Sequence, residues 1–198
     1  MRLGIPDPQS VFLNVPFDAS YEKIFVALIV ALISLGRVPR CVLEITDTGQ
    51  GRMPRITDLI AHCRVSIHDL SRVGIPVRFN MPFELGTAYT IRLVGKKHDD
   101  IIIMEKKKFR FDKTLSDLKA IDPKIHEGKP MLAISAIYEA LGRPTGNPRI
   151  EVAEKMYAQL WLNISTIRHR TATIFNRRSF NELIVGATLL AKKAGILP

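Results

Sequence analysis

The chain has 198 residues, 46% of them hydrophobic, which is enough for a core of ordinary domain size and argues against intrinsic disorder. The formal net charge of +10 favours an anionic partner such as a nucleotide, a nucleic acid or a membrane surface, although solvated Lys-rich loops would explain it equally well. The two cysteines lack metal-type spacing, so we expect neither a zinc site nor a disulfide framework.

Strand and helix patterns alternate through the first hundred residues. The expected elements, in chain order, are a strand at 10–15, a helix at 21–35, a strand at 40–44, a helix carrying Ile56, Leu59, Ile60 and Cys63, a strand at 65–71, a helix at 82–94 and a strand at 100–104. This alternation predicts an α/β fold with an open parallel sheet flanked by helices, in the strand order 2-1-3-4 or an extension of it. The apolar run 24–35 is too short to span a membrane and too far from the N-terminus for a signal peptide, so we expect a cytoplasmic protein without membrane contact.

The pattern changes after Met104. A basic run at 106–111, interleaved with aromatic residues, is either an exposed connector or an anion-binding loop. A helix at 129–141 then leads to a linker rich in proline and glycine, which predicts an α/β domain over 1–146 and a C-terminal helical extension over 147–198.

The C-terminal extension reads as a helical hairpin, with one helix from Ile150 and a second over 179–194. The first helix carries an apolar face from Val152 to Ile167, which predicts a homo-oligomer or docking on a different protein chain. The basic residues between the two helices would either contact phosphate or lie in a solvated turn; they are Arg168, His169, Arg170, Arg177 and Arg178.

Acidic and polar residues gather where the third strand and the following helix meet. Asp69 and Ser71 would end the strand, at the sheet edge where open α/β proteins bind ligands. Asn80 is a favourable N-cap and Pro82 fits a first helical turn, so Glu84 is expected in the first turn of that helix. The helix dipole alone would explain an acid there, but a strand-end Asp facing the same crevice favours a functional pair.

Other residues at this edge could bind the substrate. Pro16, Phe17 and Asp18 follow the first strand and would line the same crevice. Ser71 and Asn80 are further candidates for substrate binding there. Arg52 and Arg72 lie in loops at the same edge, where they would contact phosphate or be solvated. Two carboxylates over one pocket suit cleavage of a glycosidic bond, because the transition state is cationic at the anomeric carbon. No metal or cofactor is expected.

Three short motifs carry a family resemblance. The segments Asn14–Phe17, Ser66–Ser71 and Phe83–Ala88 resemble the nucleoside 2-deoxyribosyltransferase family and, equally, the related TIR-like nucleotide-binding domains of bacterial defence systems. The resemblance covers about residues 10–105. It implies a flavodoxin-like or TIR-like sheet, with Glu84 acting on the anomeric carbon and Asp69 holding base or sugar.

The resemblance further implies that Pro16 and Phe17 shape the nucleoside pocket. The segment Asn80–Pro82 stands where the transferases have an acidic residue and Gly-Thr, so N-glycosidic cleavage of another nucleotide, including NAD, remains open. The sequence thus predicts an N-glycosidase or transferase that could act in antiviral defence. Two alternatives remain open. One is a nucleotide-sensing module without turnover, and the other is a nucleic-acid-associated effector subunit.

Overall fold

The computed structural model describes residues 6–45, 51–72, 79–95, 100–108, 115–118, 121–143, 145–169 and 171–198. Most of the predicted polar loop before Arg52, the aromatic part of the basic run, and Arg170 lie outside these ranges. The chain forms two compact units, each built from two segments: Met1–Pro16 with Arg40–Glu127, and Phe17–Pro39 with Gly128–Pro198. This division differs from the predicted boundary at residue 146, and each unit is described by itself.

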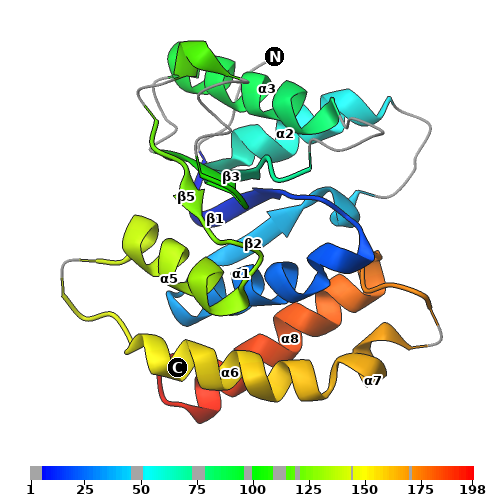
Figure 1. The fold of residues 1–198 in the computed structure, drawn as a ribbon, viewed down its shortest axis with the longest axis vertical. Coiled ribbons are helices and arrows are strands. Elements are labelled where there is room, and N and C mark those ends of the chain that lie inside the picture. The colour runs from blue at the N-terminus through cyan, green and yellow to red at the C-terminus, as the bar shows by residue number, and fades with distance from the viewer. Residues whose placement is uncertain are drawn as a thin grey trace. The chain divides into compact units, whose positions relative to one another are not determined.

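A five-stranded parallel sheet has the order β2-β1-β3-β4-β5 (Figure 1). Its strands are β1 (Asp7–Asn14), β2 (Val38–Cys41), β3 (Cys63–Asp69), β4 (Asp100–Glu105) and β5 (Lys124–Ile125). The order confirms the predicted 2-1-3-4 arrangement, extended by one strand, and is the order of flavodoxin-like folds. The last five residues of β1, of β3 and of β4 are all buried, although polar residues stand among the apolar ones in β1 and β3. Cys63, which was predicted to lie in the preceding helix, is the first residue of β3.

Because the strands are parallel, their carboxyl ends lie together at one edge of the sheet. Asn14 of β1 pairs with His68 of β3, and Asp69 pairs with Met104 of β4. The second strand is shorter than predicted, because the chain turns into a short 3₁₀ helix, η2 (Val42–Glu44). The Glu44 side chain stabilises this turn by accepting hydrogen bonds from the Cys41 amide and the Arg40 guanidinium.

Two helices of the first unit pack against β1 and β3: α2 (Arg52–His62) and α3 (Asn80–Gly95). The prediction for the start of α3 was wrong. Asn80 is the first helical residue rather than the N-cap, and the carbonyl of Phe79 accepts from the Phe83 amide at 3.1 Å. Pro82 therefore fits inside the first turn, where amides need no helical partner, and Glu84 lies in the second turn instead of the first.

Helix α1 (Glu22–Ser34) belongs to the second unit and packs against three other helices. These are α5 (Pro130–Leu141), α6 (Ile150–Leu162) and α8 (Arg177–Lys193). Every residue of α1 except Lys23 is buried, in keeping with its apolar circumference. The ring of Phe25 contacts the rings of Phe17, Phe175 and Phe180, with centroids 5.2 to 6.1 Å apart.

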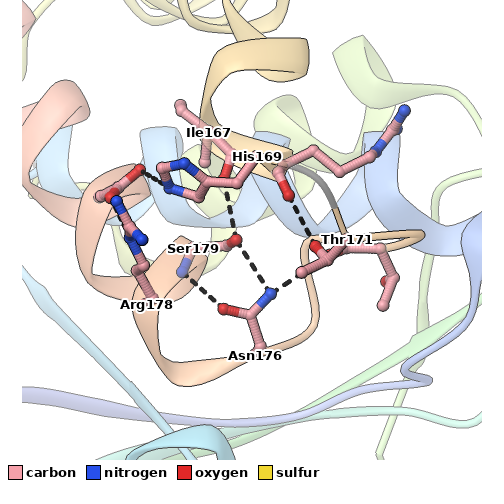
Figure 2. Close-up of polar contacts among 9 residues, drawn as sticks. Ile167, His169, Thr171, Asn176, Arg178 and Ser179 are labelled. Carbon is pink, nitrogen blue, oxygen red and sulfur yellow. Dashed lines mark hydrogen bonds and ion pairs between the residues drawn. The ribbon is translucent and has the colours of Figure 1, made fainter.

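The turn between α7 (Ile164–Arg168) and α8 is held by polar side chains (Figure 2). Asn176 caps α8 by accepting from the Ser179 amide at 2.9 Å, so the helix begins two residues earlier than predicted. The Ser179 hydroxyl donates to the carbonyl of Ile167 at 2.9 Å. Arg168 forms an ion pair with the buried Glu22, so this part of the predicted basic cluster has a structural partner. Across the described ranges, every helix is either too short or too polar to cross a lipid bilayer.

Candidate functional site

The strand order places a switch point between β1 and β3. The chain leaves β1 toward β2 on one side, and β3 lies on the other side. In open α/β sheets a crevice opens at such a point, beyond the carboxyl ends of the strands. Asn14 ends β1, and His68 and Asp69 end β3. These three residues are 0 to 2% exposed, so polar groups are buried beneath the place where a ligand would bind.

Asn14 connects both central strands to the start of α3. Its side-chain amide donates to the carbonyl of Met81 at 2.9 Å and lies 2.9 Å from Nδ1 of His68. Because one nitrogen donates to the carbonyl and also meets the ring, Nδ1 of His68 is the acceptor. The Asn14 side-chain oxygen is buried and has no hydrogen-bond partner within the described residues. The amide thus fixes the first turn of α3 over the switch point.

Glu84 follows Met81 by three residues and lies on the same side of α3, one turn further along. Its side chain is 7% exposed and makes no hydrogen bond or ion pair with the described residues. Burial raises the pKa of Glu84 to about 7, and the positive charge of Arg52 at the start of α2 opposes this rise. A carboxyl group in this environment is half ionised near neutral pH, as a catalytic acid or base often is.

A second cluster of polar side chains is centred on Asp69. One carboxylate oxygen accepts from the Ser71 amide at 2.8 Å, and the other lies 2.9 Å from Nε2 of His126. The Ser71 hydroxyl also meets Nε2 of His126, at 3.0 Å. A Ser-His-Asp triad uses the two ring nitrogens separately, so contacts from both groups to one nitrogen do not form that arrangement. Asp69 therefore holds His126 and the turn at Ser71 in position.

The cluster with Asn14 and His68 is separate from the cluster around Asp69. Side chains alternate along a strand, so Asp69 leaves β3 on the face opposite His68, whose ring meets the Asn14 amide under α3. Glu84 makes no direct hydrogen bond or ion pair with Asp69. Of the residues predicted from sequence, Ser71 contacts Asp69, and the charge of Arg52 lowers the pKa of Glu84 without an ion pair between the two.

The remaining predicted residues have other surroundings. Pro16 is buried in the first unit, directly after β1. Asn80 and Arg72 are exposed at the start of α3 and after β3. Phe17 and Asp18 belong to the second unit, where the Phe17 ring meets Phe175 and the Asp18 carboxylate accepts from Ser20. Their proposed contact with substrate stays a prediction.

Sequence reasoning missed four buried polar residues at this edge: Asn14, His68, Glu105 and His126. Asn14, His68 and Glu105 could have been found as polar residues at or near the last positions of apolar strands. His126 had no such signal, because it follows β5, a two-residue strand with no period to detect. No group of three or more potential metal ligands occurs in the described part of the chain.

Comparison with models of known protein families gave no match, and none of the curated proteins is significantly similar to this chain.

Proposed function

We propose that this protein cleaves or transfers the N-glycosidic bond of a nucleoside, a nucleotide or NAD, with Glu84 acting at the anomeric carbon. The observation that carries the proposal is a buried glutamate without a hydrogen-bond partner in the described residues, one turn from the contact that joins α3 to the switch point of the sheet. The resemblance to nucleoside 2-deoxyribosyltransferases and TIR-like domains is an independent reason for the same residue.

The chemistry needs a carboxylate in a dry setting. When the bond between the anomeric carbon and the base breaks, its electron pair leaves with the base and positive charge develops on the sugar. A carboxylate with few water neighbours stabilises that charge more strongly than it would in bulk water, or attacks the carbon to form an ester. Water then completes hydrolysis, or a second base completes transfer.

Other residues have supporting roles in this proposal. Arg52 keeps part of the Glu84 population ionised and offers a positive charge for a substrate phosphate. Asp69 is a positioning residue, because both its oxygens are engaged by His126 and Ser71. The net charge of +10 also favours an anionic substrate, such as a nucleotide, over a neutral nucleoside.

The test is release of base or nicotinamide from a panel of nucleosides, nucleotides and NAD, followed by chromatography. Glu84→Gln is expected to lower the rate by about 10²–10³ or more, because Gln keeps the shape but cannot carry the charge. Glu151→Gln makes the same chemical change at an exposed position of α6 and should leave the rate unchanged. Turnover of Glu84→Gln near the wild-type rate would contradict the proposal.

A different result would favour the non-catalytic alternative. Binding of a nucleotide without release of base, equally in the wild type and in Glu84→Gln, would indicate a nucleotide-sensing module. Calorimetry with the same panel of compounds measures that binding directly.

A further inference from the structure

Helix α8 has two apolar faces, and only one of them packs against α1. Phe180, Leu183, Ala187 and Ala191 are buried, at the spacing of a single helix face. Val185 and Leu189 lie on another face, 57% and 62% exposed, and Leu162 at the end of α6 is 82% exposed. A surface helix usually has one apolar face, which packs against the core of its own domain. The second apolar face of α8 therefore indicates a contact with another surface.

These three side chains line a groove of about 560 Å³ between α6 and α8. Gly186 and Leu160 also line the groove. A Cβ atom added at Gly186 would lie 2.9 Å from a terminal methyl carbon of Leu160, so the two helices are in close contact here. The side chains of Leu162, Val185 and Leu189 remain exposed and available to another surface.

Opposite charges flank the apolar stripe on α8. Glu182 lies at one end of the groove and Lys193 at the other, about three helical turns apart. Arg178 and His169 hold the Glu182 carboxylate in place through contacts of 3.1 and 2.7 Å. When two copies of α8 run antiparallel, Glu182 of each lies opposite Lys193 of the other, and Val185 of each lies near Leu189 of the other.

We propose that this groove is the interface of a homodimer, in which α8 packs antiparallel against α8 of a second copy about a two-fold axis between Val185 and Leu189. The charge pattern is what selects a second copy as the occupant. An acid at one end and a base at the other make the stripe complementary to itself under a two-fold rotation, as an isologous interface requires. Leu162 extends the apolar contact beyond α8.

Light scattering on the full chain tests the proposal, over a concentration series from the low micromolar range upward. We expect the wild type to reach twice the monomer mass. Leu189→Glu is expected to raise the dissociation constant by on the order of tenfold or more, because it places a carboxylate in the apolar centre of the interface. Leu93→Glu changes a leucine of α3 with similar exposure, 64%, and should not affect the dimer.

A charge reversal tests the antiparallel arrangement. Lys193→Glu should weaken the dimer by roughly twofold to fivefold, because a carboxylate then faces Glu182 of the other copy. Lys192→Glu makes the same change at an exposed position that does not line the groove, and it should have little effect. Circular dichroism checks that each variant is folded. A wild type that stays monomeric throughout, or a dimer that Leu189→Glu does not weaken, would overturn the proposal. An equal effect of Lys193→Glu and Lys192→Glu would overturn the antiparallel pairing.

Discussion

The Glu84 carboxyl group affects folding as well as chemistry, because it is buried without a hydrogen-bond partner among the described residues. Below its ordinary pKa of 4.5 the group is neutral in the folded and the unfolded chain. As the pH rises from 4.5 toward 7, the unfolded chain ionises first, and the folded state loses stability relative to it. The buried charge therefore destabilises the fold at and above neutral pH.

Glu84→Gln should remove this cost. A shift of the pKa from 4.5 to about 7 corresponds to roughly 3 kcal/mol, so the variant should be more stable than the wild type by up to that amount near pH 8. Near pH 4 the two should be equally stable. Urea unfolding at both pH values measures the difference, with Glu151→Gln as the exposed control, expected to stay within about 0.5 kcal/mol. A variant less stable than the wild type near pH 8 would mean that the carboxylate has a favourable partner.

At the level of elements, the sequence predicted most of the sheet but not every boundary. The apolar runs ending in Asn14 and Asp69 were readable as strands, and alternation with helices fixed the parallel order. The start of α3 was misplaced because asparagine is favoured at the N-cap, whereas Asn80 is the first residue of the helix. The packing of α1 was not readable, since a helix that is apolar on all sides does not specify which neighbours cover it.

The same limits applied to the candidate site. Glu84 and Asp69 could be proposed from short motifs, because acids stand out at the ends of apolar segments. Their separation into two groups depends on which face of β3 each side chain leaves and on His126, which is 57 positions from Asp69 along the chain. Long-range pairing of this kind has no local pattern in the sequence.

The Asn14 side chain should stabilise the first turns of α3 against local unfolding. Asn14→Ala removes the donor to Met81 and to His68, so we expect a loss of about 1–3 kcal/mol in stability. Amide exchange should become faster over residues 81–88 by a larger factor than over α2. Ser66→Ala is the matched control, because its buried hydroxyl has no partner in the described residues and its removal should be nearly neutral. Equal acceleration in both helices would show that Asn14 acts only on global stability.

At the scale of the whole molecule, the chain passes between the two compact units three times. The first unit is completed only after residue 127, and the second takes α1 from near the N-terminus and four helices from the C-terminus. Neither unit is a continuous stretch of sequence. A cut between the predicted domains at residue 146 would therefore divide the second unit internally.

A chain truncated after Gly146 tests this organisation. It keeps the complete first unit together with α1 and α5, but it lacks α6 and α8, which cover α1 in the second unit. Exposed apolar surface of that extent favours aggregation, so we expect poor solubility, binding of a hydrophobic dye and no cooperative thermal transition. A chain ending at Ala194 loses only the last residues after α8 and should unfold cooperatively close to the wild-type temperature. A soluble 1–146 fragment with a sharp transition would show instead that the predicted boundary separates two independent domains.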